Sequence, residues 1–182
     1  INYFYNWVGF QAQNAEQAFI GGAEFSFNSM GKIGEVDLTT LLGYTYMYPI
    51  SLNKDSLYKL SFSDPSTNML KYRFNHMAKA DIQATYKAFS VGVSSRYNSY
   101  MRNIDRVFED GVLGQELLVG MANYRSVFNK GVAVFDARFG YQINEAFKVN
   151  FIANNLFNKE YVSRPGDVQA PRNFILQMQL AL

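Results

Sequence analysis

Alternation of apolar and polar residues is the most regular feature of this chain. In the last nine residues, 174–182, every second residue is apolar, and Gln177 and Gln179 lie on the other side. A period of two predicts a β-strand with one apolar and one polar face, whereas a helical period would scatter the same residues around an axis. We expect eight strands in the segments 2–10, 18–28, 35–48, 77–86, 89–101, 132–143, 147–155 and 174–182.

The connections between these segments alternate in length. Short turns are predicted at 29–32, 86–88 and 144–146, and long loops at 49–76, 103–131 and 159–172. Short turns on one side and long loops on the other are typical of outer-membrane β-barrels, whose periplasmic turns are short. The order of the segments then predicts that residue 182 lies at the periplasmic rim.

Composition agrees with a β-protein but leaves its class open. The chain has 182 residues, among them 16 Phe, 13 Tyr and one Trp. Aromatic residues favour strands and form belts at membrane interfaces, but soluble β-sandwiches and lipocalin-like barrels are also rich in them. The 17 basic and 15 acidic residues give no bulk charge that would point to nucleic acid, and Cys is absent. No stretch approaches the roughly 20 apolar residues of a membrane-spanning helix.

The N-terminal residues do not resemble a targeting segment. Residues 1–6 contain no basic start, no long apolar core and no small-residue cleavage site. We therefore expect a mature chain, a truncated chain or a part of a longer one.

Two short motifs near the C-terminus carry a family resemblance. The run N-N-L-F-N-K-E-Y at 154–161 is followed by a loop and by P-R-N-F at 171–174. This pair resembles the C-terminal end of TonB-dependent outer-membrane receptors, in which the first motif ends the penultimate strand and the second opens the last. The family usually ends in an aromatic residue, whereas this chain ends in Leu182. The motif residues are Asn155, Leu156, Phe157, Asn158, Tyr161, Pro171, Arg172 and Phe174.

Looser similarity to the same family extends over nearly the whole chain. It includes 70–76 with the strand that follows, 89–100, 131–141, and the G-A-E and G-Y-T-Y elements at 22–24 and 43–46. Barrels of this family have about 22 strands around a plug. The resemblance therefore implies an all-β fold in which residues 1–182 form an antiparallel transmembrane β-barrel segment. These would be about eight strands from the C-terminal part of the barrel, without the plug domain.

The resemblance also implies a function and partners. It implies TonB-dependent import of a large scarce nutrient, such as a ferric chelate, a corrinoid or a glycan, across the outer membrane of a Gram-negative bacterium. The expected partners are the remainder of the receptor, outer-membrane lipid and lipopolysaccharide, the TonB complex through the N-terminal part, and a surface lipoprotein. No nucleic-acid partner, cofactor, metal or catalytic activity is expected. Two alternatives stay open, namely a complete eight-stranded barrel with a structural or adhesive role and a soluble lipocalin-like binding barrel.

Charged residues within the predicted strands should face the barrel lumen. Arg96, Asp136 and Arg138 fall on the polar faces of their segments. A basic residue facing lipid near the bilayer midplane costs about 2–4 kcal/mol. We expect these side chains to form a structural ladder or to contact the plug rather than to bind substrate directly. The residues expected to face lipid are Phe135, Phe139, Phe147, Val149, Phe151, Leu176 and Met178.

The loops contain few residues that suggest chemistry. His76 is the only histidine, so no Ser-His-Asp set can be argued and a rim position is favoured over a metal site. Asp105, Glu109 and Asp110 lack the spacing of a calcium loop and are expected to be solvated. Aromatic loop residues could contact a ligand, but the sequence does not choose among Tyr58, Phe62, Phe108 and Tyr124.

Overall fold

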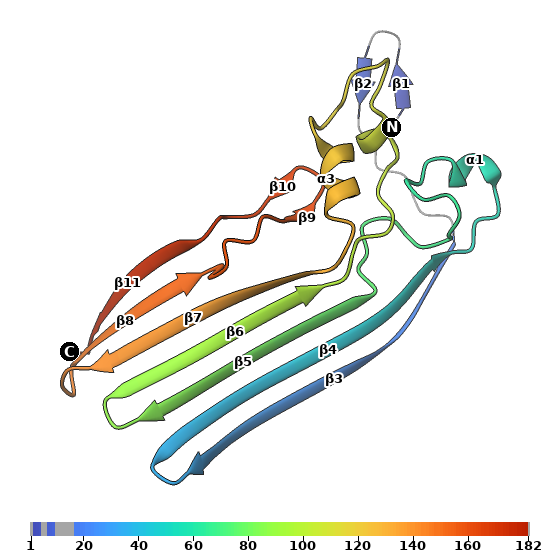
Figure 1. Ribbon diagram of the computed structural model, residues 1–182. Coiled ribbons are helices and arrows are strands. Elements are labelled where there is room, and N and C mark those ends of the chain that lie inside the picture. The colour runs from blue at the N-terminus through green and yellow to red at the C-terminus, as the bar shows by residue number, and fades with distance from the viewer. Residues whose placement is uncertain (1, 5–6, 10–16, 182) are drawn as a thin grey trace. The chain divides into compact units, whose positions relative to one another are not determined.

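A computed structural model describes residues 2–4, 7–9 and 17–181. Its main element is a seven-stranded antiparallel sheet with the strand order β11-β8-β7-β6-β5-β4-β3 (Figure 1). The all-β antiparallel architecture predicted from the sequence is confirmed. The strands are β3 (Ala18–Ile33), β4 (Val36–Ser51), β5 (His76–Tyr86), β6 (Phe89–Asn98), β7 (Val132–Gln142), β8 (Phe147–Asn154) and β11 (Asn173–Leu180).

The prediction of a single strand over 2–10 is wrong. The structure has two short strands there, β1 (Asn2–Phe4) and β2 (Trp7–Gly9), which pair with each other in an antiparallel hairpin. Each of these strands is three residues long, which is too short for a period of two to reveal the reversal between them. Residue 10, like residue 182, lies outside the described residues.

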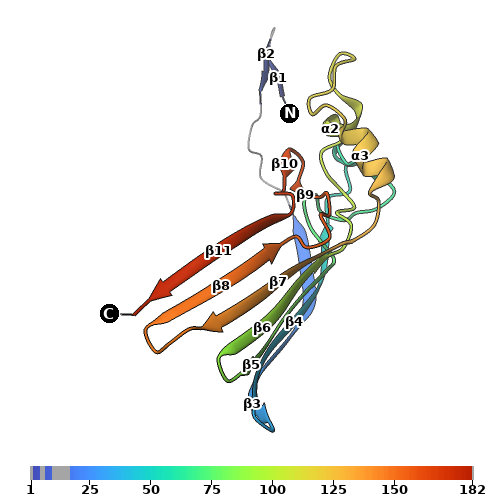
Figure 2. The ribbon, with the colours of Figure 1, turned by 60° about the vertical axis from the view of Figure 1, so that its left-hand side comes forward.

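The first turn of the sheet also lies elsewhere than predicted. Strand β3 continues through 29–32, the predicted turn, and the chain reverses at Gly34 and Glu35. Gly34 has φ 61°, a left-handed conformation that tight two-residue hairpins require and that glycine adopts readily. The other two short turns and the three long connections lie where they were predicted, so the short turns share one end of the sheet (Figure 2).

The strand registers separate the two faces of the sheet. Gln83 lies opposite Gly92, Gly92 opposite Arg138, and Arg138 opposite Ile152, which makes one row of the polar face. The neighbouring row of the other face contains Val91, Phe139, Phe151 and Leu176. The long connection between β8 and β11 holds a small ladder of β9 (Val162–Arg164) and β10 (Asp167–Val168).

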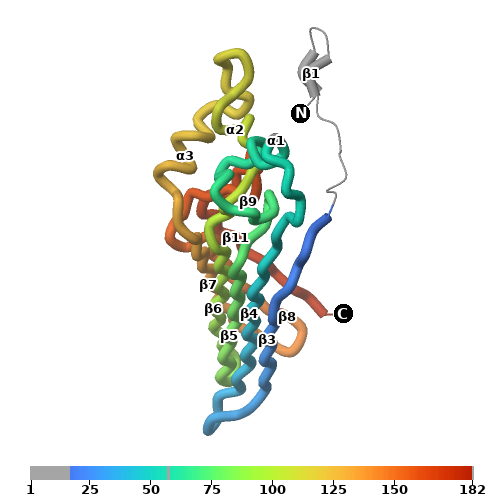
Figure 3. The backbone as a smooth tube through the Cα atoms, turned by 90° about the vertical axis from the view of Figure 1, so that its right-hand side faces the viewer, coloured from blue at the N-terminus to red at the C-terminus, as the bar shows by residue number. Residues whose placement is uncertain are grey.

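The two longest connections fold together into a second compact unit. Segments 47–74 and 101–129 group apart from 22–46, 75–100 and 130–182, which form the sheet unit. We call the unit formed by segments 47–74 and 101–129 the loop unit (Figure 3). Its core is Met101, Ile104 and Met121. Three short helices lie in it, namely α1 (Ser56–Lys59), α2 (Val107–Asp110) and α3 (Met121–Val127).

The alternation pattern did not predict these helices. In the part of the chain that the structure describes, no helix has the length and apolar composition needed to cross a membrane.

Candidate functional sites on the sheet and in the loop unit

A bidentate ion pair spans three strands on the polar face. Arg138 on β7 donates from Nη1 and Nη2 to the two carboxylate oxygens of Asp81 on β5, both at 2.8 Å. Ser94 on β6 donates to Asp81 at 2.5 Å and lies 2.7 Å from Arg138 Nη1. Two parallel bonds make this a bidentate pair, which fixes direction as well as distance.

A glycine makes room for this pair. A Cβ at Gly92 would lie 2.8 Å from Nη2 and 2.9 Å from Nε of Arg138, so the guanidinium crosses β6 directly over the glycine. Sequence reasoning placed Arg138 on the polar face but did not predict its partner or the need for glycine. The sequence feature that could have indicated this contact is a glycine on the polar face of β6, because a glycine inside a strand often marks the close approach of another group.

A second ion pair on the same face ties the sheet to the β8–β11 connection. Arg96 Nη2 lies 3.3 Å from Asp136 Oδ2, and the backbone N–H of Asn155 donates to Asp136 Oδ1 at 2.8 Å. The structure therefore places all three charged site residues, Arg96, Asp136 and Arg138, on one face of the sheet. It does not join the three into one network, because Arg96 pairs with Asp136 whereas Arg138 pairs with Asp81.

A shallow depression of about 180 Å³ lies next to Arg138 on the same face. Gly92 and Gly140 are buried beneath it. Lys148 lines it, and its side-chain ammonium has no ion-pair or hydrogen-bond partner among the described residues. The remaining lining residues are Gln83, Ser90, Arg138, Asn150, Ile152 and Gln177. The sequence did not single out this group.

The motif residues build the start of the β8–β11 connection. Asn155 and Asn158 both have φ 49°, a left-handed conformation that Asn tolerates better than most residues. The N–H of Asn158 donates to the carbonyl of Asn155 at 2.7 Å, which closes a tight turn. The buried Asn155 side chain donates to the carbonyls of Lys159 and Ala170 and accepts from the N–H of Lys159. Asn158 Oδ1 accepts from the N–H of Arg172 at 2.9 Å, so the first motif bonds directly to the second.

The apolar members of the motifs lie over neighbouring rings. Phe174 stacks on Phe151 with ring centroids 5.8 Å apart, and Arg172 lies 5.8 Å from the Phe174 ring. Phe157 packs edge-on against Phe135. Leu156 donates its N–H to the carbonyl of Phe135 at 2.7 Å, Tyr161 accepts from the N–H of Gln169, and Pro171 accepts from the Asn173 side chain. These contacts show that the motif residues stabilise the structure of the β8–β11 connection.

Aromatic side chains form two bands on the apolar face. Tyr86, Phe89 and Tyr141 occupy one row at the turn end. Near the other end lie Tyr44, Tyr46 and Tyr97. Phe89 and Tyr97 are eight residues apart on β6, which is roughly 26 Å of strand at about 3.3 Å per residue. Val91, Val93 and Phe139 lie between the two bands, and an apolar band flanked by aromatic girdles is typical of outer-membrane barrels.

His76 belongs to the second band. Its Nδ1 lies 2.8 Å from the hydroxyl of Tyr44, and its ring lies 5.2 Å from that of Tyr46. The sole histidine, at the start of β5, therefore contacts two tyrosines of this band.

Buried polar side chains hold the loop unit together. Arg125 on α3 pairs through Nε with Glu109 and donates to the carbonyls of Met101 at 2.9 Å and Arg102 at 3.0 Å. Asn103 is fully buried and donates to the carbonyl of Met69 at 2.9 Å. The Arg125 bonds stabilise 101–129 internally, and the Asn103 bond joins that segment to 47–74, so the two long connections form one structure.

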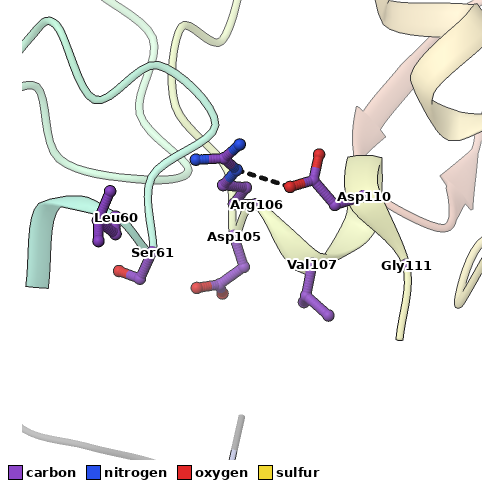
Figure 4. A pocket seen from close by; sticks show the side chains of 7 residues that line it. All are labelled: Leu60, Ser61, Asp105, Arg106, Val107, Asp110 and Gly111. Atoms are coloured by element: carbon purple, nitrogen blue, oxygen red, sulfur yellow. Dashed lines mark hydrogen bonds and ion pairs between the residues drawn. The ribbon is translucent and has the colours of Figure 1, made fainter. Parts of the chain in front are cut away.

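A pocket of about 270 Å³ opens on this unit, lined by Leu60, Ser61, Asp105, Arg106, Val107, Asp110 and Gly111 (Figure 4). Within it Arg106 Nε donates to Asp110 at 2.6 Å. Lys71 pairs with Asp105 at 2.5 Å. Each member of the acidic group considered for calcium therefore has a basic partner, since Glu109 pairs with Arg125.

Tyr72 completes this network. Burial, together with a hydrogen bond that its hydroxyl donates to Asp105, raises the pKa of Tyr72 well above its usual range. The residue also has φ 60°, a conformation uncommon for a bulky side chain. Tyr72 is thus held neutral at the centre of the loop unit.

The loop aromatics serve mainly as packing. Phe62 is 1% exposed and packs edge-on against Tyr58, and Phe108 and Tyr124 pack against the core of the loop unit. The structure therefore shows that these aromatic residues pack inside the loop unit, a role that the sequence could not distinguish from ligand contact.

Comparison with solved structures identifies the fold. Over 90% of its length the chain is similar to the ferric-catecholate import receptor Fiu from E. coli in its closed form, with 22% identity and a TM-score of 0.63. It is similar over the same share to the siderophore receptor PiuA from Acinetobacter baumannii (13%, 0.60) and to FpvA from P. aeruginosa bound to an iron–pyoverdine complex (14%, 0.59). The matches cover 21%, 22% and 19% of those chains, so this chain spans about a fifth of their length.

The fold is thus that of a β-barrel segment of siderophore receptors, and the resemblance to TonB-dependent receptors is confirmed at the level of fold. No protein-family model matches the chain, and no curated protein matches it either.

Proposed function

We propose that residues 1–182 are a C-terminal portion of the β-barrel of an outer-membrane receptor that imports a ferric siderophore. The observation that carries the proposal is a seven-stranded antiparallel sheet with one largely apolar and one largely polar face and the fold of siderophore receptors. In this proposal the plug and the segment that contacts the TonB complex belong to other parts of the receptor.

The exposed apolar face supports a place in the membrane. Leu176 and Met178 are 62% and 64% exposed, and Phe139 and Phe151 are each 46% exposed. An apolar surface continuous over six strands is larger than a soluble monomer usually exposes. Lipid between the two aromatic bands would cover it, and lipopolysaccharide would be its outer-leaflet neighbour.

The edges of the sheet support a larger barrel. In the described residues β3 is paired only with β4, and β11 only with β8. A closed small barrel of this chain, whether membrane-bound or lipocalin-like, would require the two outer strands to pair with each other. Further strands of the receptor would satisfy both edges, which a membrane environment demands of every backbone group.

The polar face would then line the lumen. Arg96, Asp136 and Arg138 would form a ladder in the barrel wall, because one ion pair joins β6 to β7 and the other joins β7 to β5. The long connections at the other end from the short turns would face the outside of the cell.

The cargo class is drawn from the similar structures. Fiu is described as a ferric-catecholate import receptor, PiuA as a siderophore receptor, and FpvA is bound to iron–pyoverdine. These names support a ferric siderophore and give no support to a corrinoid or a glycan. They are transport receptors, which supports a non-enzymatic role. No observation supports a surface lipoprotein partner.

The test is iron uptake by the full-length receptor in a Gram-negative host that lacks its own ferric siderophore receptors. We expect uptake of radioactive iron from at least one ferric siderophore, and loss of that uptake when a protonophore collapses the inner-membrane gradient. Absence of uptake with a panel of catecholate and pyoverdine chelates, or uptake that persists without the gradient, would refute the proposed function. A heat-modifiable band on gels verifies that the barrel has assembled.

A further inference from the structure

Across β5–β8, the polar face of the sheet carries more positive than negative charge. Both acidic side chains on these four strands are already paired, Asp81 with Arg138 and Asp136 with Arg96. The basic side chains of the same four strands on this face are Lys79, Arg96, Arg138 and Lys148. Two lysines therefore remain without an acidic partner among the described residues.

Lys148 is the one of these two that lies in a shaped site. It lines the depression beside Arg138 and is partly buried, whereas Lys79 is exposed above Gly43. A Cβ at Gly140 would lie 3.3 Å from Lys148 Cε and 2.6 Å from the side-chain oxygen of Asn150. The glycine thus leaves room for the lysine and the amide to approach the sheet.

The other groups in the depression suit an anionic oxygen. The amides of Gln177 and Asn150 lie within reach of each other, with Asn150 Nδ2 3.4 Å from Gln177 Oε1. Amide N–H groups and a lysine ammonium are donors that together bind a carboxylate. A partly buried lysine without a counter-ion is unfavourable, so an acidic occupant would be stabilising.

The size of the depression selects the occupant. Its volume of about 180 Å³ is below the roughly 300–1,000 Å³ of small-molecule pockets. A single carboxylate side chain fits such a space, whereas a ferric chelate does not. Because the chain spans about a fifth of the similar receptors, most of a receptor of that size lies outside residues 1–182 and can supply the side chain.

We infer that Lys148, with the amides around it, binds an Asp or Glu side chain from a part of the receptor outside residues 1–182. The inference rests on the proposed function in that it takes the chain as part of a larger receptor. It makes Lys148 an anchor between the barrel wall and another segment.

The test is carbodiimide crosslinking of the full-length receptor in outer-membrane vesicles. The reagent joins an amine and a carboxylate in direct contact as an amide, and takes up the released water as a urea. Mass spectrometry should find the Lys148 peptide linked to an acidic peptide outside residues 1–182. This crosslink should be lost in Lys148→Arg, which keeps the charge, and retained in Lys79→Gln, which removes a lysine elsewhere on the same face.

An assembled receptor in which Lys148 forms no crosslink, or forms one only within residues 1–182, would overturn the inference. Because the wild-type crosslink decides, a variant that fails to assemble does not affect the outcome. Iron uptake distinguishes the two proposals. Uptake without the crosslink refutes only the anchor, and the crosslink without uptake refutes only the ferric siderophore cargo.

Discussion

Replacing Arg125 by Met should open the loop unit without disturbing the sheet. The Arg125 side chain is 9% exposed, and that of its partner Glu109 is 24% exposed. The substitution keeps an unbranched apolar stem but removes the donors to Glu109 and to the carbonyls of Met101 and Arg102. A carboxylate and two backbone acceptors would then lose a partner in a confined site.

The expected loss can be estimated from this environment. Breaking a buried ion pair by removing one partner costs about 3–5 kcal/mol, but water reaches Glu109, so about 2–3 kcal/mol is the better estimate here. At about 1.4 kcal/mol per factor of ten, this corresponds to roughly 30- to 140-fold faster exchange of amides that open with the unit.

Hydrogen–deuterium exchange of the full-length receptor in detergent measures this loss by peptide. Peptides from 101–129 and from 58–74 should lose protection together, because Asn103 and Tyr72 bond the two segments. Peptides from β6 and β7 should keep their protection, since local units open separately from the rest of a protein.

Arg106→Met is the matched control in the same unit. Its ion pair with Asp110 is exposed and four residues apart, and such pairs are worth about 0.3–0.5 kcal/mol, or roughly a twofold change in exchange. Equal effects of the two substitutions, or loss of protection throughout the sheet in Arg125→Met, would refute the assignment of Arg125 as the internal support.

Three further outcomes follow from the geometry. Gly92→Val should impair barrel assembly, seen as loss of the heat-modifiable band, because its Cβ would lie 2.8 Å from a guanidinium nitrogen, whereas Gly31→Ala, with open space around the Cβ, should assemble normally. Val93→Arg on the apolar face should destabilise the barrel by about 2–4 kcal/mol in urea titrations, and Thr39→Arg on the polar face by much less. The raised pKa of Tyr72 means that its neutral form stabilises the loop unit fully below about pH 10, the ordinary tyrosine pKa, and that this stability is lost as pH rises further. Protease resistance of the loop unit should therefore fall above pH 10 in the wild type, with a weaker dependence in Tyr72→Phe; identical profiles would exclude this role.

Local pattern was sufficient for the strands of the sheet. Alternation predicted six of the seven strands to within three residues at each end, because the side-chain period of a strand is two wherever one face is apolar. It was less successful near Gly31 and Gly34. Either glycine could have formed the turn, and only pairing with the partner strand selects the register.

Pairings between distant segments were not accessible from the sequence. Alternation placed Arg138 on the polar face, but both Asp81 and Asp136 on that face were possible partners. Arg138 reaches Asp81 because the strand register brings together two residues that are 57 positions apart in the sequence, and because Gly92 leaves space for the guanidinium between them. The partnerless state of Lys148 has the same origin, since it became evident only when the acidic residues were seen to be paired elsewhere.

By itself, the sequence determined the β-class, the two faces of the sheet, the ends at which the long loops lie and the family resemblance. Each of these depends on residues close together in the chain. The tertiary structure decided that segments 47–74 and 101–129 form one unit with its own core. It also decided that Phe62 is buried and that each acidic residue considered for calcium has a basic partner. Those outcomes depend on contacts across tens of residues, which chain entropy opposes and which only the complete set of packing and hydrogen bonds stabilises.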